Sequence, residues 1–300
     1  MWVWFAFGSA LFAGLTAVLA KVGVRDTDST LATAIRTVVV LVAACLMVVL
    51  VGSQDQLSSL AADTLWFLVL SGLATGASWL CYFRALQLGK VNQVAPVDRS
   101  SLVLTVVFAM VFLGETSRLE TRLPGLVLIA AGTWLMASSR GRPVATAASE
   151  GVGPSNAGGT GGRGWLPYAV GAAVFAALTA ILGKVGITGV ESNLGTAVRT
   201  AVVLVMAWLM VAVTGRRPGR WRLPRRDLLF IVLSGLATGA SWLCYFRALQ
   251  EGPASVVAPI DKLSIVFTVA FSAAVLGERL TRRAALGLLL IVAGTLLMLA

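Results

Sequence analysis

Ionisable side chains that lie in or beside long apolar segments are the residues of this chain best suited to chemistry. They form two sets of five, and each member of the second set follows its counterpart by 163 residues. The first set is Lys21, Arg36, Arg84, Asp98 and Arg99, and the second is Lys184, Arg199, Arg247, Asp261 and Lys262. Ionisable groups in apolar surroundings usually face protein or water and pair with one another. Both sets could therefore form gating ion pairs; snorkelling or structural salt bridges are the alternative.

Hydroxyl-bearing side chains follow one face of a predicted helix in each half of the chain. Their spacing of four, three and four positions aligns them on one side of a helix. The first face carries Ser71, Thr75, Ser78 and Tyr82 with Trp79 beside it, and its counterpart carries Ser234, Thr238, Ser241 and Tyr245 with Trp242. Because an apolar wall with a few hydroxyls can orient an amphipathic solute, we expect these ten residues to line a solute site.

Small residues next to these faces support a second interpretation. Gly72 and Gly76, like their counterparts Gly235 and Gly239, form GxxxG patterns that let two helix backbones approach closely. Serine and threonine hydroxyls can also bond to carbonyl groups of their own helix. The sequence alone leaves helix packing and solute binding open for this region.

The elements that position these residues occur twice. Residues 69–87 read VLSGLATGASWLCYFRALQ, and residues 232–250 repeat all nineteen letters. The match extends outwards and includes Lys21 with Lys184 and Glu115 with Glu278. Self-similarity on this scale predicts one structural unit in two copies. We expect repeat 1 at residues 1–137, a flexible linker rich in Gly, Ser and Ala at 138–164, and repeat 2 at 165–300.

The composition indicates that both units are embedded in a membrane. Apolar residues make up 58% of the chain, charged residues 12%, and the mean hydropathy is +0.88. A soluble domain would carry about a quarter charged residues. Each unit has five apolar runs long enough to cross the hydrocarbon, at 2–20, 31–51, 65–88, 94–113 and 123–137, then 165–182, 194–213, 228–250, 255–276 and 284–300. We expect an all-α integral membrane protein with ten transmembrane helices.

Five spans in each unit make the second unit run inverted relative to the first, so the predicted fold is two inverted five-helix repeats. The loops differ accordingly, because residues 52–63 contain no Lys or Arg and their counterpart 215–227 contains six arginines. If the N-terminus is outside, only Arg118, Arg122 and Lys184 face outwards, and fifteen basic loop residues face the cytoplasm. The positive-inside rule thus predicts both termini outside and the linker in the cytoplasm of a plasma (inner) membrane protein. This distribution explains the net charge of +11 better than nucleic-acid binding does.

Several function classes lack the residues that they need. The chain has no histidine, and Cys45, Cys81 and Cys244 show no metal-ligand or disulfide spacing. We therefore expect no metal, no cofactor and no enzymatic activity. No acidic residue lies near the middle of a span, which argues against proton-coupled export of cations. Each charged set holds four bases and one acid, which favours a neutral, zwitterionic or anionic solute.

One motif pair resembles a known family. APVDRSSLVLTVVFAMVFLGE at 95–115 with AGTWLM at 131–136 recurs as APIDKLSIVFTVAFSAAVLGERL at 258–280 with AGTLLM at 293–298. A fourth helix opened by proline, then Gly-Glu, then a glycine-rich fifth helix resembles the EamA family of the drug/metabolite transporter superfamily. The resemblance covers the chain except the linker. Each half also resembles the half-length, five-helix members that pair, so this chain is similar to a fused tandem.

The resemblance implies a secondary transporter, an exporter or facilitator, for a small metabolite such as an amino acid. It implies a small-molecule substrate and the lipid bilayer as partners, with no nucleic acid. One chain is expected to suffice, and an oligomer is compatible with the sequence. Members of this family are usually described with both termini in the cytoplasm, the reverse of the charge count. A non-transporting membrane scaffold or sensor is the alternative function.

The expected mechanism is alternating access between the inverted repeats. Chain direction places the first charged set near one membrane face and the second set near the other. We expect two ion pairs, Asp98 with Arg36 or Arg99 and Asp261 with Arg199 or Lys262. Pro96 and Pro259 are expected in the first turn of their helices, where a missing N–H costs little.

Overall fold

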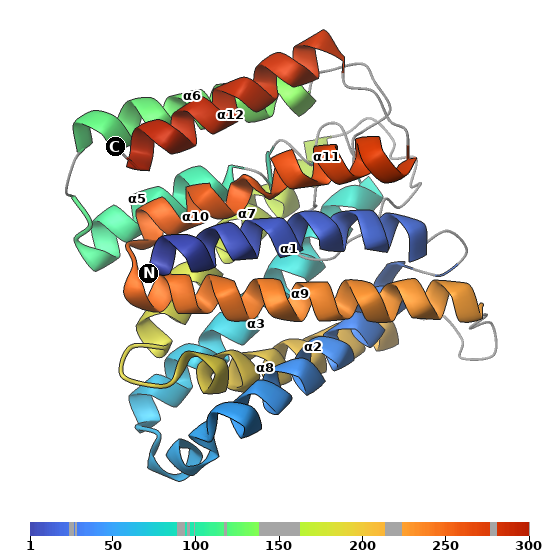
Figure 1. Ribbon diagram of the computed structural model, residues 1–300, viewed down its shortest axis with the longest axis vertical. Helices are drawn as coiled ribbons and strands as arrows, with labels where there is room; N and C mark the ends of the chain where they lie inside the picture. The colour runs from blue at the N-terminus through green and yellow to red at the C-terminus, as the bar shows by residue number, and fades with distance from the viewer. Residues whose placement is uncertain are drawn as a thin grey trace.

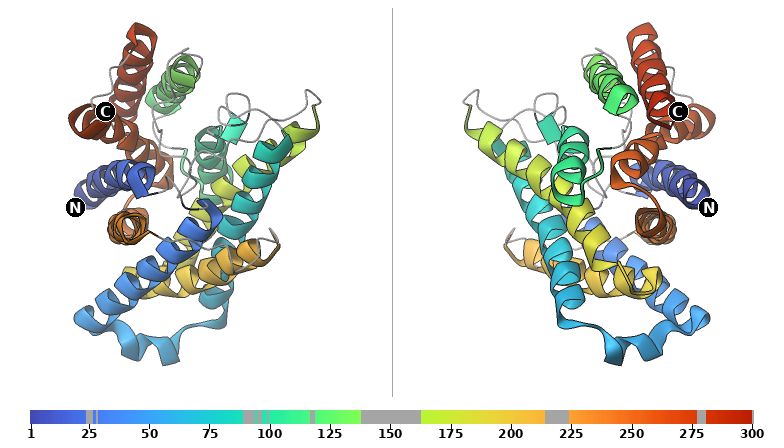
Figure 2. Two further views of the ribbon diagram at one scale, coloured as in Figure 1. Left: turned by 90° about the vertical axis from the view of Figure 1, so that its right-hand side faces the viewer. Right: turned by 90° about the vertical axis from the view of Figure 1, so that its left-hand side faces the viewer.

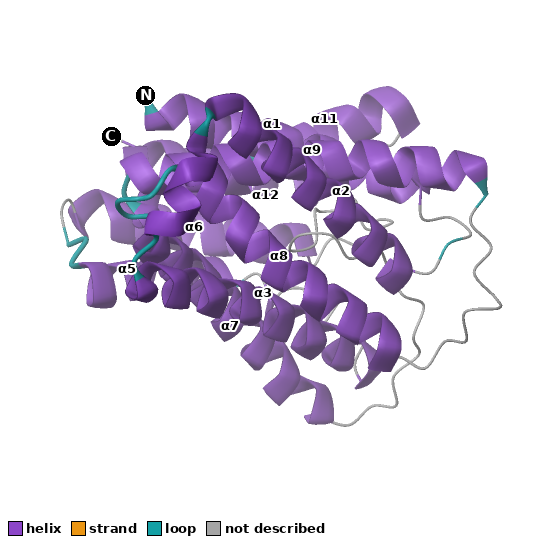
Figure 3. Ribbon diagram, turned by 90° about the horizontal axis from the view of Figure 1, so that it is seen from below, coloured by secondary structure: helices purple, strands orange, loops and turns teal. Residues whose placement is uncertain are grey.

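The computed structural model describes residues 1–23, 27, 29–88, 94, 97–98, 100–116, 119–137, 163–213, 224–276 and 281–299. Within these ranges the regular elements are helices, without a strand (Figure 3). Most of the predicted linker (138–162) and of the arginine-rich loop (214–223) lies outside the described residues, as do Pro96, Arg99 and Glu278.

The helices follow the predicted apolar runs. Repeat 1 contributes α1 (Trp2–Gly23), α2 (Ser29–Val51), α3 (Ala62–Leu88), α5 (Ser101–Leu113) and α6 (Leu119–Ala137). Repeat 2 contributes α7 (Leu166–Gly186), α8 (Ser192–Val213), α9 (Arg225–Glu251), α10 (Ala254–Lys262), α11 (Ser264–Leu276) and α12 (Arg282–Leu299). Two short 3-10 helices, η1 (Ser53–Ser59) and η2 (Arg163–Trp165), precede α3 and α7. Except in the fourth and ninth runs, the bounds agree with the prediction to about one turn.

The helices have the length and composition of membrane spans. Eight stretches of the described chain are long and apolar enough to cross a membrane. Helix α5 is shorter, and the first turn of α6 carries Glu120 and Arg122. Large apolar side chains such as Val42, Trp66 and Trp134 are exposed, which suits contact with lipid. The protein is therefore an all-α integral membrane protein.

Helices of one repeat pack mainly on helices of the other repeat. The most extensive contacts join α1 with α9, α3 with α7, α6 with α12 and α2 with α8 (Figure 1). Replacing each helix by its repeat counterpart reproduces the same set of pairs, so the arrangement has approximate two-fold symmetry. Helices α3 and α9 are counterparts and run in opposite directions across the molecule, as inverted repeats require.

Glycines bring α6 and α12 into direct backbone contact. A Cβ atom on Gly132 would lie 2.5 Å from the carbonyl oxygen of Gly287, and one on Gly294 would lie 2.6 Å from that of Gly125. These distances are shorter than any normal carbon–oxygen contact. Only glycine therefore fits at these crossings. The hydrophobic effect does not drive helices together in lipid, so the close packing that small residues allow stabilises the contact instead.

The GxxxG glycines of α3 and α9 serve the same purpose. Gly72 lies against Val202 of α8, and its counterpart Gly235 lies against Val39 of α2. A Cβ atom at either glycine would approach the valine Cβ to 2.7 Å. These glycines therefore make helix-packing contacts, which is one of the two interpretations that the sequence left open.

The packing defines two helix bundles, each built from both repeats. Helix α1 packs on α9, α10 and α11, and we call these four helices the α1 bundle. Helix α7 packs on α3 and α5, and we call these three helices the α7 bundle. Figure 2 shows the bundles as two arms, with α2 and α8 crossing beneath them, and the arms meet where α10 packs on α5. Both chain ends lie on one side in Figure 1, which we call the N-terminal face.

The ninth predicted span is broken, and the prediction for its proline was wrong. Helix α10 ends at Lys262, and α11 begins at Ser264. Pro259 lies inside α10, beyond its first turn, and lacks the N–H that would bond back to Ser255. The helix begins five residues before the proline because Glu115 of repeat 1 caps it, as described below, and such a distant partner leaves no local sequence signal.

Candidate functional site

The guanidinium group of Arg199 lies at the centre of the contacts between repeats. Arg199 comes from α8, and its side chain is fully buried. Nη2 donates to Thr75 Oγ1 at 2.8 Å, and Nε donates to Ser71 Oγ at 3.4 Å, both on α3. The guanidinium carbon lies 4.2 Å from the centre of the Phe246 ring and 4.9 Å from that of Trp242, both on α9.

These neighbours reduce the cost of burying a cation. Hydroxyl oxygens accept from the guanidinium, and aromatic faces attract its positive charge. The hydroxyls come from repeat 1 and the rings from repeat 2, so Arg199 links α3 to α9 through α8. A buried ionisable group in a membrane protein is a candidate functional group by default.

The two predicted hydroxyl faces lie against the central helix of each bundle. On α3, Ser71 donates to the Thr179 carbonyl and Ser78 to the Ala172 carbonyl, both at 2.9 Å. Thr75 donates to the carbonyl of Ser71 one turn earlier at 3.0 Å and lies 3.3 Å from Thr179 Oγ1. The hydroxyls of Ser71, Thr75 and Ser78 thus lie at the contact between α3 and α7, and those of Ser71 and Thr75 also accept from Arg199.

The second face repeats this arrangement on α1. Ser234 donates to the Thr16 carbonyl at 3.3 Å, and Ser241 donates to the Ser9 carbonyl at 3.1 Å. Thr238 lies 3.3 Å from Thr16 Oγ1 and donates to the Ser234 carbonyl at 2.8 Å. The Ser and Thr hydroxyls of both faces therefore join the helices within each bundle, and the lining of a solute site by these faces stays a prediction.

The predicted aromatic residues lie in the interior. Trp79, Tyr82 and Trp242 are buried, and Tyr245 is partly buried. Tyr245 makes an edge-to-face contact with Phe246, with ring centres 5.3 Å apart. Trp79 and Trp242 belong to one apolar core that spans both bundles. The lining of a solute site by these aromatic residues stays a prediction.

The predicted gating charges have different surroundings. Ser9 Oγ donates to Asp261 at 2.6 Å and lies 3.2 Å from Ser241 Oγ, which ties α10 to α1 and α9. Asp98 and Arg36 are buried, and Arg36 makes a long 3.5 Å contact with Thr33 on its own helix. The partners expected for Asp98 and Asp261 stay predictions.

Two arginines lie at the edge of the molecule instead. Arg84 is exposed and donates to Gln87 at 2.9 Å. Arg247 forms an ion pair with Glu251 on the same helix at 2.7 Å. Lys262 is partly buried, and the side chains of Lys21 and Arg99 lie outside the described residues.

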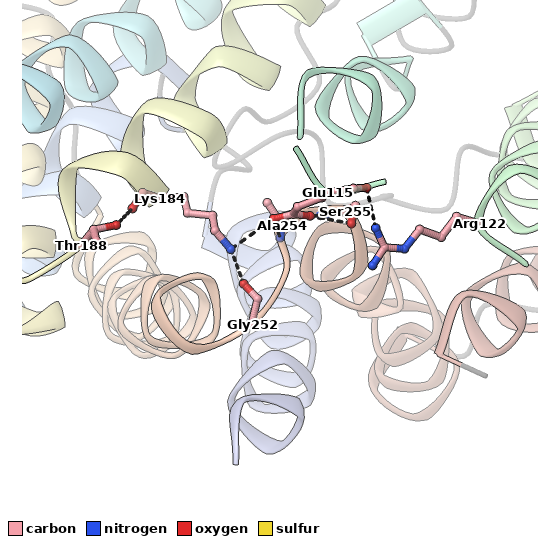
Figure 4. Close-up of polar contacts among 7 residues, drawn as sticks. All are labelled: Glu115, Arg122, Lys184, Thr188, Gly252, Ala254 and Ser255. Carbon is pink, nitrogen blue, oxygen red and sulfur yellow. Dashed lines mark hydrogen bonds and ion pairs between the residues drawn. The ribbon is translucent and has the colours of Figure 1, made fainter. Parts of the chain in front are cut away.

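Lys184 belongs to a cluster of polar groups that the sequence analysis did not predict. Its ammonium group lies 3.2 Å from Glu115 Oε1 and donates to the Gly252 carbonyl (Figure 4). Glu115 follows α5 in repeat 1, whereas Lys184 and Gly252 belong to repeat 2. The direction of the helices places Glu115 and Lys184 near the same membrane face. That shared location is the one sequence feature that could have indicated their contact.

The Glu115 carboxylate caps α10. It accepts from the N–H groups of Ala254 and Ser255, both at 2.9 Å, and from the Ser255 hydroxyl at 2.6 Å. Arg122 donates to the backbone carbonyl of Glu115 at 2.8 Å. Burial raises the pKa of the carboxyl, but the bonds from Ser255 and Ala254 and the charge of Lys184 outweigh it, so the pKa lies below its ordinary value.

Comparison with known proteins is consistent with these features. The model of the EamA-like transporter family matches residues 1–138 and again residues 163–300. A Sinorhizobium protein described as an uncharacterized transporter in the cobO 3' region is 48% identical over 136 residues, which cover 45% of this chain and 96% of that relative. That relative is therefore about as long as one repeat.

A solved crystal structure shares the fold. It superimposes with a TM-score of 0.74 at 17% sequence identity, over 99% of this chain and 96% of the other. The repeated family match, the all-helical membrane fold and the packing between repeats lead to one assignment. The chain is a multi-pass membrane transporter and belongs to the EamA-like transporter family.

Proposed function

We propose that this protein is a secondary transporter, an exporter or facilitator, that moves a small metabolite by alternating access. The observation that carries the proposal is the pair of bundles related by two-fold symmetry, each built from both inverted repeats. Two equivalent bodies of this kind can adopt two arrangements of nearly equal energy, one open to each side. In the proposed mechanism, the two repeats are residues 1–137 and 165–300.

The proposed solute is neutral, zwitterionic or anionic, for example an amino acid. Arg199 supports this class, because a buried cation beside the pathway repels a cationic solute and attracts a carboxylate. The aromatic rings around it suit an apolar solute body.

The proposed solute site lies between the bundles near the middle of the membrane. It uses the paired aromatic residues Trp79, Tyr82, Trp242 and Tyr245, with Ser78 and Ser241 as polar groups. The site must form when the bundles move apart, because most of these side chains are buried in the present arrangement.

The proposed orientation has the N-terminal face outside the plasma (inner) membrane and the linker in the cytoplasm. The distribution of Lys and Arg supports it. A cysteine introduced at Ser155 in a cysteine-free background should then be protected from an impermeant maleimide in intact cells. Labelling of this cysteine in intact cells would show that the linker lies outside and would contradict the proposed orientation.

Solute flux into proteoliposomes tests the proposed function. A screen of radiolabelled amino acids, sugars and nucleotides should find at least one solute that accumulates only in vesicles containing the protein. Trp79→Ala and Trp242→Ala should each lower that flux about ten-fold at equal protein content, because each removes one wall of the site. A complete screen without flux would favour the scaffold or sensor function.

A further inference from the structure

Three polar contacts join the two bundles at the N-terminal face. Glu115, at the end of α5, bonds to the first residues of α10. Lys184, in the last turn of α7, donates to the carbonyl between α9 and α10. Gln250 of α9 donates from Nε2 to the carbonyls of Ile187 and Val190, at 2.8 and 2.5 Å, in the turn after α7. We call this set of contacts the latch.

The latch contacts that involve Glu115 and Lys184 bring groups of opposite charge or partial charge together. The first N–H groups of a helix carry partial positive charge and have no partner within the helix, so a carboxylate stabilises them. Lys184 adds a full positive charge on the other side of Glu115. Bonds between charged partners are about twice as strong as neutral ones. Water can replace every partner once the face opens, so the net stabilisation is limited.

An apolar contact lies directly below the latch. The Phe246 ring of α9 packs on Gly183 of α7, where a Cβ atom would lie 2.6 Å from the ring. The ring thus fits between the bundles only because α7 has no side chain there. The latch and this contact together close the same face at two depths.

We propose that the latch holds the transport pathway closed at the N-terminal face. This inference rests on the proposed function, since it assigns the latch to one of two alternating states. Opening requires the α5 and α7 ends to withdraw Glu115 from the start of α10 and Lys184 from the Gly252 carbonyl. The latch lies between the bundles, so it opposes their separation, unlike a contact within one bundle.

A cysteine placed behind the latch reports opening. Ala258 lies one turn below Ala254 and Ser255, is buried, and packs against side chains of α5, α6 and α12. Ala258→Cys in a cysteine-free protein in nanodiscs should react slowly with a hydrophilic maleimide. Glu115→Gln and Lys184→Met should each raise the reaction rate roughly three- to ten-fold, because each removes charge from the latch.

A matched control uses the same substitution on the same face. Glu191 caps α8 through the N–H of Leu194 and accepts from Ser53, so it joins η1 to α8 and does not link the bundles. Glu191→Gln should leave the labelling of Ala258→Cys unchanged. A second reporter, Ala44→Cys, is fully buried between α2 and α8 and should stay unreactive in all variants.

The outcomes separate the latch from the function. Equal labelling in wild type, Glu115→Gln and Lys184→Met would overturn the latch, even if solute flux is measured. Faster labelling of Ala44→Cys as well would show general loosening and also overturn it. Because labelling needs no solute, a changed rate at Ala258→Cys without any measurable flux would support the latch and contradict the proposed transport. If Glu115→Gln does not insert, Lys184→Met decides, since it leaves the α10 cap in place.

Discussion

At the scale of single residues, the buried Arg199 and the partly buried Glu115 are stabilised by different partners. Arg199 combines hydroxyls from α3 with aromatic faces from α9, whereas Glu115 combines helix N–H groups with Lys184. Neither set could be predicted by pairing opposite charges in the sequence, because only one of these partners is an opposite charge. The sequence does place Arg199 inside an apolar run and Glu115 at the end of one.

Substitutions at Arg199 should separate stability from transport. Arg199→Met should keep a melting temperature close to that of wild type, because Ser71 and Thr75 retain backbone partners, yet it should reduce flux about ten-fold. Arg199→Lys keeps the charge but loses the planar group that contacts both rings, so it should cost about 2 kcal/mol. Thermal unfolding in detergent and flux measure the two effects. Full flux in the Arg199→Met variant would show that Arg199 does not act in the solute pathway.

The Glu115 cap should depend on pH in a defined direction. Its pKa is lowered in the folded protein, so its contribution to stability is present at neutral pH and is lost as pH falls through the lowered pKa. Lys184 faces the carboxylate, and Arg122 donates to the backbone carbonyl of Glu115. Wild type should therefore melt about 2–4 °C above Glu115→Gln at pH 7 and at pH 5.5, and the difference should shrink only below the ordinary pKa range of a glutamate carboxyl. A difference that disappears already between pH 7 and 5.5 contradicts this assignment.

At the scale of helices, the apolar runs predict where spans lie but not how they are interrupted. Run length and charge determine the bounds of α1, α2, α3 and α9 because a helix must cover the hydrocarbon. The start of α10 depends on Glu115, which lies 139 residues before Ala254. Such a cap cannot be read from local sequence.

The crossing of α6 and α12 should tolerate no side chain. Gly132→Ala should destabilise the protein by about 1–3 kcal/mol, because its Cβ would meet the Gly287 carbonyl, and a backbone atom cannot rotate away. Gly164→Ala is the matched control, since nothing lies within 4 Å of a Cβ there. Melting temperatures of both variants check this. Equal values for the two would mean that the helices cross at a greater distance.

At the scale of the whole molecule, the repeat predicts two equivalent units, but the structure pairs their helices across units. The sequence repeat gives no information on which helix packs on which, because that depends on faces that are nearly identical in both copies. The bodies proposed to move are consequently the α1 and α7 bundles, and neither corresponds to one sequence repeat.

Interleaved packing makes each repeat dependent on the other. Residues 1–150 and 151–300 expressed together as separate chains should assemble and co-purify, because most helix contacts cross between repeats. Each fragment expressed alone should be degraded or should form dimers of itself, because the helix faces that contact the other repeat would be uncovered. Purification from membranes with one tagged fragment measures this. Stable monomers of either fragment would contradict the described packing.

Distances between the bundles at the two faces test the central claim most directly. Spin labels at Thr188 and Glu251 report the N-terminal face, and labels at Leu166 and Leu229 report the opposite face, with all four positions exposed. Double electron–electron resonance would compare wild type with Glu115→Gln, and wild type with and without a transported solute. Alternating access predicts that the first distance increases while the second decreases. Two distances that stay constant, or that change in the same direction, would contradict alternating access between these bundles.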